Sequence, residues 1–524
     1  MNGRSVVSLV RVLYLALILL LAFRGTATLA DDLSLAGFAG GIEISGSSTN
    51  PLIAEIDGDS SNGKEIAVAS RNGTVTVLKR DGTTLWSAYT PNYGCARTSD
   101  SDKVYSSPAA GDLNQDGAND LVLGYGGYAS GREDTAACHG GVVAFDGRSG
   151  QILWNLDLGK FAKKQHFFSF FPSVYSTPAI ADVNGDGKLE IAFGSLDRNV
   201  YLLNYLGKVL FYYLAADTIF SSPAFANVNN DTLLDLIIGT DISGNNALKP
   251  PTKDGGNVYA LSFDKANFKR RKTKPYRCYF RDDDCVVWMT PVNQVVQSAP
   301  VIADFVSSVA GEEVAIGTGC YFGKELGKKI LVLNLSSGSV LRTLQTTACM
   351  TSSVAAGDVD GDGLSEVIAL VSGHASFGGD GTSKLVVYDA ESGSVQWQAS
   401  LENSSYSHND AAIASDLDGN GSLEIMVSDK KQIKVYEGST GELLSCDNSD
   451  CSAEAELEVS GSSTVPAAGD LDGDGDLELV GSSGAVFAWG GFAGVLNSQS
   501  GPHPPNSSPS AMWRIDSSRK GNVD

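Results

Sequence analysis

The stretch Asp358-Val-Asp360-Gly-Asp362-Gly-Leu-Ser-Glu366 decides the fold, because it recurs along the chain inside a larger repeated block. Each block has a small polar run, an alanine-rich apolar run, an acidic cluster and a β-rich run. The clearest copies are SSPAAGDLNQDGANDLVLG from Ser106, STPAIADVNGDGKLEIAFG from Ser176, SSVAAGDVDGDGLSEVIAL from Ser352, AAIASDLDGNGSLEIMVS from Ala411 and TVPAAGDLDGDGDLELVG from Thr464. A looser copy begins at Asn50, and two decayed copies begin at Ser221 and Ser298. An internal repeat of this kind sets the architecture of the whole chain.

The spacing of the repeats indicates the size of each structural unit. The first acidic-loop positions fall at residues 55, 112, 182, 227, 304, 358, 416 and 470, so successive copies lie 45 to 77 residues apart. This spacing suits a four-stranded blade with its loops. No run beyond the first thirty residues shows helical periodicity. We therefore predict an all-β chain that forms a β-propeller of eight four-stranded blades, with seven blades as the alternative if the copy at residue 304 is an insertion.

The two ends of the repeat region predict how the ring closes. The run IEISGSSTNPLIAEIDGD from Ile42 echoes LEVSGSSTVPAAGDLDGD from Leu457. The segment 37–48 therefore resembles the last strand of a unit that begins near the C-terminal end of the repeats, at residues 464–496. An N-terminal strand that completes the last blade would leave no loose sheet edge.

The acidic clusters have the chemistry of a calcium site. Their carboxylates or amides stand at positions 1, 3 and 5 of a nine-residue loop, with an acid at position 9. Ca²⁺ takes six to eight oxygen ligands in a flexible shell, and a glycine at position 6 permits the sharp turn that such a loop needs. A mere surface turn would explain one copy but not five at matched places in a repeat. We predict about five or six Ca²⁺ sites that fasten each loop to the start of its strand.

The predicted metal ligands fall into six loops. Five loops are complete, namely Asp112/Asn114/Asp116/Asp120, Asp182/Asn184/Asp186/Glu190, Asp358/Asp360/Asp362/Glu366, Asp416/Asp418/Asn420/Glu424 and Asp470/Asp472/Asp474/Glu478. The sixth, Glu55/Asp57/Asp59 with Glu65, carries an insertion. The loop from Asn227 to Asp235 loses charge and lacks the glycine, so we expect weak binding or none. Asp304 has no partners at positions 3 and 5, and we expect no ion there.

The ends of the chain predict secretion and set the domain boundaries. An apolar run from Val12 to Phe23 follows Arg4 and Arg11 and precedes small residues that end at Ala30, as in a signal peptide. The run is short for a membrane span, although an uncleaved anchor helix is the alternative. We divide the chain into a signal peptide at 1–30, a β-propeller at 31–496 and a disordered Ser/Pro/Gly-rich tail at 497–524. No membrane span is expected after cleavage.

Cysteines and sequons fit an oxidising, extracellular compartment. Eight cysteines without a C-x-x-C pair favour disulfides over a zinc site. Neighbours in sequence would pair as Cys95–Cys138, Cys278–Cys285, Cys320–Cys349 and Cys446–Cys451. Sequons for N-glycosylation begin at Asn72, Asn230, Asn334, Asn403, Asn420 and Asn506. The segment 265–284, with its KRRKTK and RDDD runs, reads as an insertion within a blade.

The acidic loops and their flanks resemble the FG-GAP/VCBS repeats of integrin-α-like propellers over roughly residues 37–496. That resemblance implies extracellular binding or adhesion with calcium as a structural ion. The F-G-x-x-[GA-P] phrase is poorly kept here, since the copies read S-S-P-A, which separates the chain from true integrin subunits. In addition, AFDGRSGQILW from Ala144 resembles the blade-docking motif of pyrroloquinoline-quinone-type propellers, whose tryptophans lock blade to blade.

The sequence favours binding over catalysis. The formal charge of −23 excludes nucleic acid, which needs a basic footprint. None of the five histidines lies in a recognised catalytic motif, and no G-x-S-x-G elbow is present. We expect a secreted monomer that is not an enzyme and that binds an extracellular protein or glycan. The alternative is a propeller enzyme, either a polysaccharide lyase or hydrolase or a quinone-dependent dehydrogenase.

Overall fold

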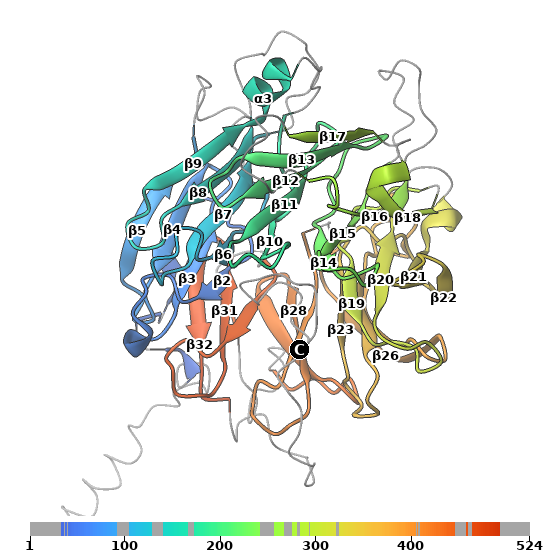
Figure 1. Cartoon of the computed structure of the whole chain (residues 1–524). Helices are drawn as coiled ribbons and strands as arrows, with labels where there is room; N and C mark the ends of the chain where they lie inside the picture. Colours follow the sequence, from blue (N-terminus) through green and yellow to red (C-terminus); the bar gives the residue numbers. More distant parts are fainter. Residues whose placement is uncertain are drawn as a thin grey trace, which may run out of the picture.

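A computed structural model describes the chain from residue 33 to residue 492, apart from residues 36, 39, 92–103, 128–139, 166–171, 242–255, 267–274, 280–282, 293, 321–323, 405, 407–408, 446–456 and 460–463. Eight sheets follow one another along the chain and surround a common axis as the blades of a propeller (Figure 1). The predicted all-β fold with eight blades is confirmed. The decayed copies at residues 227 and 304 each form a blade, so the seven-blade alternative is wrong.

The strands of each blade are numbered in chain order. Blades 1 to 4 contain β2 (Leu52–Ala54), β3 (Glu65–Ala69), β4 (Thr74–Leu78) and β5 (Thr84–Tyr89); β6 (Ala109–Gly111), β7 (Asp120–Tyr125), β8 (Gly141–Phe145) and β9 (Ile152–Asp157); β10 (Ala179–Ala181), β11 (Glu190–Gly194), β12 (Asn199–Asn204) and β13 (Val209–Leu214); and β14 (Ala224–Ala226), β15 (Asp235–Gly239), β16 (Asn257–Leu261) and β18 (Val286–Pro291). Blades 5 to 8 contain β19 (Val301–Ala303), β20 (Glu313–Thr318), β21 (Lys329–Asn334) and β22 (Val340–Gln345); β23 (Val354–Gly357), β24 (Glu366–Val371), β25 (Ser383–Asp389) and β26 (Ser394–Leu401); β27 (Ile413–Ser415), β28 (Glu424–Asp429) and β29 (Gln432–Glu437); and β30 (Ala467–Gly469), β31 (Glu478–Ser482) and β32 (Ala485–Trp489).

Burial follows the place of each strand within its blade. The second strand of blade 2, β7, is buried at every residue, whereas its outer strand, β9, begins exposed. Blades stack on one another through apolar side chains, and one core cluster joins Val75 and Val77 of blade 1 to Leu121 and Leu123 of blade 2. Radial stacking therefore buries both faces of each sheet, which an isolated sheet of this composition could not do.

The N-terminal strand closes the ring as predicted. Strand β1 (Ile42–Glu43) pairs antiparallel with β32, where Ile42 lies opposite Val486. The fourth strand of blade 8 thus comes from the start of the repeat region, and the other three come from its end. This pairing ties the two ends of the ring together and leaves no open edge between blades 8 and 1.

Tryptophans on outer strands dock onto the next blade, as the docking-motif resemblance implies. Their indole nitrogens donate to carbonyls in the turn after the third strand of the next blade, in the pairs Trp86–Gly147, Trp154–Tyr205, Trp288–Leu335 and Trp397–Gly438. A Cβ on Gly150 would lie 2.6 Å from the Trp86 ring, so that turn needs a glycine. Arg342 takes the tryptophan's place in blade 5, and its Nε donates to the Glu391 carbonyl of blade 6.

An inserted strand and two disulfides add to the regular ring of blades. Strand β17 (Tyr276–Tyr279) comes from the predicted insertion of blade 4. It pairs parallel with β13 of blade 3 and so connects the two blades. The Cys278–Cys285 and Cys320–Cys349 disulfides are confirmed. The predicted pairs Cys95–Cys138 and Cys446–Cys451, the signal peptide and the tail lie outside the described residues.

Short helices interrupt the connections between strands. A short α-helix, α3 (Leu158–Lys164), follows β9 because Asp157 caps it, a feature that hydrophobic periodicity missed. The 3₁₀ turns are η1 (Ser60–Asn62), η3 (Asp283–Cys285), η4 (Lys324–Gly327) and η5 (Ala375–Phe377). None of the helices in the described part of the chain is both long and apolar enough to cross a membrane.

Candidate metal centres in the strand-connecting loops

The acidic loops all lie on one face of the propeller, which we call the loop face. Each loop connects the innermost strand of a blade to the second strand, as Asp112–Asn119 connects β6 to β7. Strand pairing fixes both ends of the loop, because Gly111 lies opposite Asp120 in the antiparallel register. The sheet therefore holds position 9 beside the start of the loop before any ligand is considered.

The acid at position 9 is buried and supports the backbone of its own loop. Glu424 is 0% exposed, and its Oε2 accepts a hydrogen bond from the Leu417 amide at 2.7 Å. The same bond from the position-2 amide recurs in all eight blades, to Glu65, Asp120, Glu190, Asp235, Glu313, Glu366, Glu424 and Glu478. Insertions make Glu65 the eleventh and Glu313 the tenth residue of their loops, and both are called position 9 here because they begin the second strand as the others do. One carboxylate oxygen is committed to the loop by this bond, and the other is left for a further partner.

Positions 1 and 3 bring further carboxylates next to position 9. One oxygen from each residue lies within 4.8 Å of the others in the groups Glu55/Asp57/Glu65, Asp358/Asp360/Glu366, Asp416/Asp418/Glu424 and Asp470/Asp472/Glu478. Three anionic oxygens at this separation repel one another and can share one cation. These four loops therefore bring together the predicted ligands at positions 1, 3 and 9.

Two predicted loops have an asparagine at position 3 and so offer one carboxylate fewer. Asn184, a predicted ligand, donates from Nδ2 to Glu190 Oε2 at 3.2 Å, so its amide nitrogen faces the acid at position 9. The Asn114 amide nitrogen lies 3.5 Å from Asp146 Oδ2 in the neighbouring turn. Both side chains thus act as donors here, whereas a cation would require their oxygens as ligands.

The turn within each loop depends on glycine at position 6. Gly363 has a φ of 93°, and its amide donates to Asp358 Oδ2 at 3.0 Å. The same left-handed backbone occurs at Gly117, Gly187, Gly421 and Gly475. A residue with a side chain would be strained in this conformation, so the glycine lets position 1 accept an amide from its own loop.

Position 5 supports the end of the loop rather than the carboxylate group. Its side-chain oxygen accepts the amide two residues further on, at distances from 2.6 to 3.0 Å, in Asp116, Asp186, Asp362, Asn420 and Asp474. Asp186 and Asp474 are exposed. No position-5 residue joins a close carboxylate group in the described part of the chain. Position 5 is a predicted ligand together with positions 1 and 3, and in the structure the following turn directs an amide at its side chain.

Burial among neighbouring acids raises the pKa of the position-9 carboxyl groups. The pKa of Glu424 rises to about 9 because its burial disfavours the charged form and Asp418 lies close by. In the same way the pKa rises to about 8 for Glu190 and Glu366, about 7 for Glu65, Glu478 and Asp235, and about 6 for Asp120. A carboxyl group in such a position is stabilised by a proton or by a cation.

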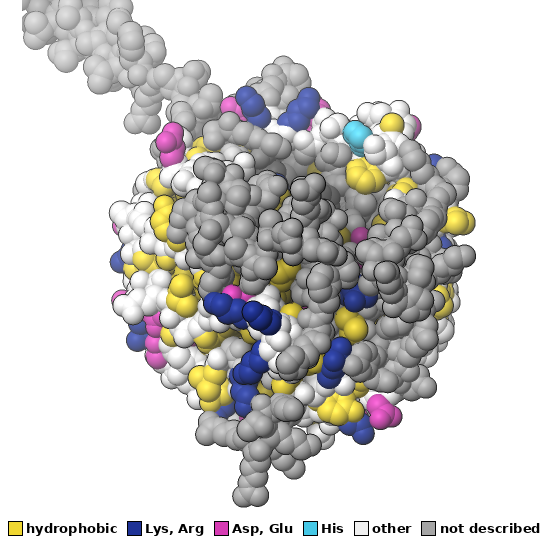
Figure 2. Space-filling model, turned by 90° about the horizontal axis from the view of Figure 1, so that it is seen from above, with side chains coloured by type: hydrophobic (Ala, Val, Ile, Leu, Met, Phe, Trp, Pro, Cys, Tyr) yellow, Lys and Arg dark blue, Asp and Glu magenta, His cyan; other side chains and the backbone are white. Residues whose placement is uncertain are grey.

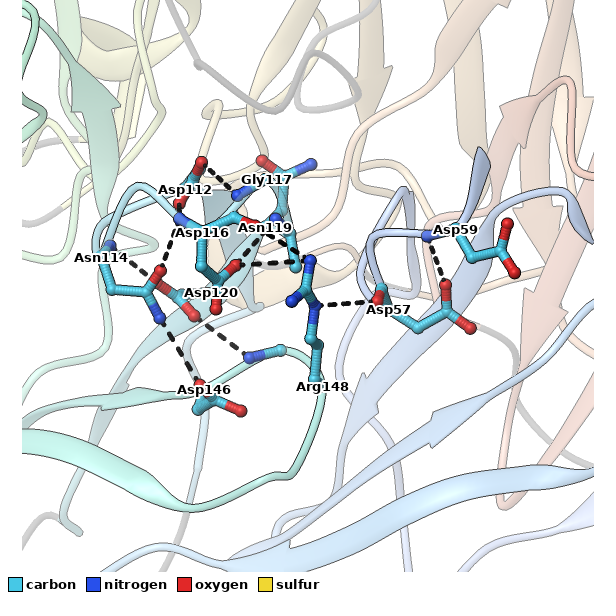
Figure 3. A network of polar contacts seen from close by, with 12 residues as sticks. Asp57, Asp59, Asp112, Asn114, Asp116, Gly117, Asn119, Asp120, Asp146 and Arg148 are labelled. Carbon is cyan, nitrogen blue, oxygen red and sulfur yellow. Dashed lines mark hydrogen bonds and ion pairs between the residues drawn. The ribbon is translucent and has the colours of Figure 1, made fainter. Parts of the chain in front are cut away.

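An arginine joins the acidic loops of blades 1 and 2, and no sequence motif had pointed to it as a site residue (Figure 3). Arg148, in the turn between β8 and β9, donates from Nε to the Asp57 carbonyl at 3.1 Å and from a terminal nitrogen to the Asp116 carbonyl at 2.9 Å. The same turn contains Asp146, the residue that faces the asparagine of loop 2. The only sequence signal for this contact is the docking motif that contains both residues, which predicts a turn against the preceding blade.

The chemistry of the loop of blade 7 fits a bound cation. Asp416 Oδ1 and Glu424 Oε1 are both buried and have no hydrogen-bond partner among the described residues. Buried oxygens without a donor are costly, and two from neighbouring carboxylates are the pattern that a metal ion satisfies. Single oxygens of this kind also occur in Glu55 of blade 1, Asp235 of blade 4 and Glu313 of blade 5, whereas blade 7 has two in one loop. Asp59, a predicted ligand of the blade 1 loop, instead caps η1 through the Ser61 amide.

The decayed loops keep the support but lose the carboxylate group. Asp235 and Glu313 are 0% exposed and accept their position-2 amides as the other acids do. Asn227 stands at position 1 of blade 4, and its amide donates to the Asp231 carbonyl at 3.0 Å. Thr232 takes the place of the glycine and does not adopt a positive φ. Blades 4 and 5 therefore show that the buried acid supports its loop even where the group of three carboxylates is missing.

Comparison with known proteins supports the repeat and the ring. An FG-GAP-like repeat model matches residues 416–481, which contain the loops of blades 7 and 8. No curated protein sequence matches the chain. Exotype rhamnogalacturonan lyase YesX is 15% identical with a TM-score of 0.51, over 85% of this chain and 72% of the lyase. Quinohemoprotein alcohol dehydrogenase from Comamonas testosteroni is 12% identical with a TM-score of 0.50, over 90% and 78% of the two chains. At this identity the likeness shows the propeller fold alone.

Proposed function

We propose that this chain is a secreted, calcium-binding β-propeller that serves as an extracellular binding module for a glycan or a protein. The observation that carries the calcium part is the group of three carboxylate oxygens within 4.8 Å at the same place in four blades. Two further loops have the same repeat positions with asparagine at position 3. Oxygen ligands of this number and flexibility favour Ca²⁺ over Mg²⁺, which prefers fewer protein ligands and retained waters.

The proposed role of calcium is structural. Each ion would join positions 1 and 3 of a loop to the acid that begins the second strand, and it would remove the repulsion among those acids. Glu55/Asp57/Glu65 and the five complete loops are the proposed sites. In the loops from Asp112 and Asp182, the asparagine amide would turn its oxygen towards the ion. The resemblance to integrin-α-like and VCBS repeats supports this role, as does the FG-GAP-like match over blades 7 and 8.

The remaining features support the secretion and binding parts of the proposal. The N-terminal segment reads as a signal peptide, and two disulfides join described residues, which fits an oxidising compartment. The one described histidine, His374, caps η5 with its imidazole rather than serving a catalytic group. We therefore propose a binding module and keep a propeller enzyme as the rival function.

A glycan and protein array, probed with calcium and with EDTA, tests the proposal. We expect partner binding that weakens on chelation, with the partner recovered unchanged. Release of unsaturated sugars or reduction of a quinone-linked dye would instead support the enzyme. A melting temperature that does not change with EDTA would contradict the calcium part separately.

A further inference from the structure

One position of the repeat forms a ring of side chains at the end of the propeller opposite the loop face. It lies seven residues before loop position 1, and we call its residues the rim. The innermost strand of each blade runs towards the loop face, so residues that precede it lie at the other end of the ring. In the first seven blades the rim residues are Ser48, Tyr105, Tyr175, Phe220, Gln297, Thr351 and Asn409.

Contacts across the ring place the rim at the mouth of the central axis. The Asn409 side-chain amide of blade 7 donates to the Tyr105 carbonyl of blade 2 at 3.0 Å, although these blades are not neighbours. Asn50 of blade 1 donates to the Asn409 carbonyl, also at 3.0 Å. Rim residues from blades that are not neighbours therefore meet near the axis of the ring.

One side of the rim is aromatic. The rings of Tyr105 and Tyr175 stack with centroids 4.2 Å apart, and Phe220 meets Tyr175 edge-on at 5.8 Å. Tyr105 and Phe220 are half-buried, and Tyr175 is 6% exposed. Three successive blades thus present a continuous aromatic surface with two partly exposed rings, whereas later blades have polar side chains at this position.

A cation lies over the end of the aromatic surface. The Arg71 guanidinium, in the turn between β3 and β4, is 4.8 Å from the Tyr105 ring centroid. Arg71 is exposed, and its side chain forms no hydrogen bond or ion pair with any described residue. An exposed guanidinium with five N–H donors therefore lies beside an aromatic ring.

Polar groups and local charge complete the arrangement. Gln297 and Asn409 are half-buried on the non-aromatic side, and Asn409 Oδ1 is without a hydrogen-bond partner among the described residues. Figure 2 shows this end of the propeller, with Lys and Arg side chains beside its middle. The turn that follows β28 adds the exposed Lys430 and Lys431, of which Lys430 pairs with Glu402 at 2.7 Å. A chain of charge −23 thus presents exposed basic side chains at this end of the propeller.

We propose that the rim binds a sugar residue that carries a carboxylate, as part of an acidic glycan. The aromatic surface of Tyr105 and Phe220 would take the apolar face of the sugar ring. The Arg71 fork would pair with the carboxylate, and the half-buried amide of Gln297 would bond to a hydroxyl. The assignment rests on the proposed binding function, because it names the ligand class and the place on the ring.

Titration calorimetry on the calcium-loaded protein tests the proposal with two probes, a hyaluronan tetrasaccharide and its methyl ester. The variant Arg71→Gln should weaken binding of the acid roughly 10-fold and leave the ester unchanged, because only the acid offers a charged acceptor. Tyr105→Leu should weaken both probes roughly 5-fold through loss of stacking. Lys208→Gln, an exposed residue in the turn between β12 and β13 at the loop face, is the matched control and should change neither affinity.

The outcomes separate the rim from the wider function. Equal loss of both probes on Arg71→Gln, or no effect of either rim variant, would overturn the rim assignment. Failure of the unaltered protein to bind the acid would also overturn it. If the unaltered protein still binds another glycan or a protein on the array, the proposed function stands although the rim assignment has failed. Melting curves of each variant confirm that the comparison is between folded proteins.

Discussion

The loop of blade 7, from Asp416 to Glu424, and the loop of blade 5, from Asp304 to Glu313, occupy the same place in the ring and each contain three acids, but the acids stand at different positions. In both, a fully buried glutamate accepts the amide at position 2, and its second oxygen has no hydrogen-bond partner among the described residues. Only blade 7 of the two adds carboxylates at positions 1 and 3 within 4.8 Å of that glutamate. The comparison separates two roles that the repeat combines, since position 9 supports the loop and positions 1 and 3 create the demand for a cation.

Among these tests, removal of calcium should change the stability of the protein most, because it acts on all six proposed calcium loops. With EDTA we expect the melting temperature to fall, because six loops lose their cations and retain crowded carboxylates. Each site that is saturated at 100 times its Kd contributes about 2.7 kcal/mol to the free energy of unfolding. Differential scanning calorimetry with and without calcium measures the shift. Magnesium at the same concentration is the control and should restore little of the loss.

The metal-free protein should lose stability as pH rises from about 5 to about 9. The position-9 groups have raised pKa values in the folded state, between about 6 for Asp120 and about 9 for Glu424. The folded state therefore binds more protons than the unfolded state in this range, and deprotonation destabilises it. With calcium present the trend should reverse, since the ion binds the deprotonated groups. Chemical unfolding at pH 5, 7 and 9, with and without EDTA, checks both signs.

The matched substitutions Glu424→Gln and Glu313→Gln test the two roles of position 9. Glutamine can still accept the position-2 amide, so Glu313→Gln should change the free energy of unfolding by only about 0.5 kcal/mol. Glu424→Gln removes a proposed ligand. It should abolish the contribution that calcium in blade 7 makes to the free energy of unfolding, about 2.7 kcal/mol at 100 times Kd. Unfolding curves in calcium and in EDTA measure each. Equal losses for both variants in calcium would show that blade 7 holds no ion.

A smaller effect is expected from repair of the loop of blade 4. The double variant Asn227→Asp with Thr232→Gly restores the acid at position 1 and the glycine whose left-handed backbone the complete loops use. Titration calorimetry should then count one additional calcium per chain. Thr232→Gly alone is the control and should add none, because position 1 would still be an amide.

Features that recur in the repeat could be predicted from the sequence, whereas features that depart from the repeat could not. Eight blades, ring closure through residues 42–43 and the six acidic loops follow from spacing and from matched positions. The helix α3 was missed because seven residues are too few for a clear periodicity, and its cap Asp157 is the only signal. The pairing of β17 with blade 3 joins segments far apart in the chain, which local patterns do not encode. The unequal standing of positions 5 and 9 required the geometry of the folded loop.

A crystal structure of the protein grown in calcium tests the central claim most directly. Anomalous scattering collected at long wavelength would identify each ion. The account predicts calcium between positions 1, 3 and 9 in the loops that begin at Glu55, Asp112, Asp182, Asp358, Asp416 and Asp470. It predicts weak occupancy or none in the loop that begins at Asn227, and none in the loop that begins at Asp304. Empty carboxylate loops at millimolar calcium, a fully occupied ion in blade 4 or any ion in blade 5 would contradict it.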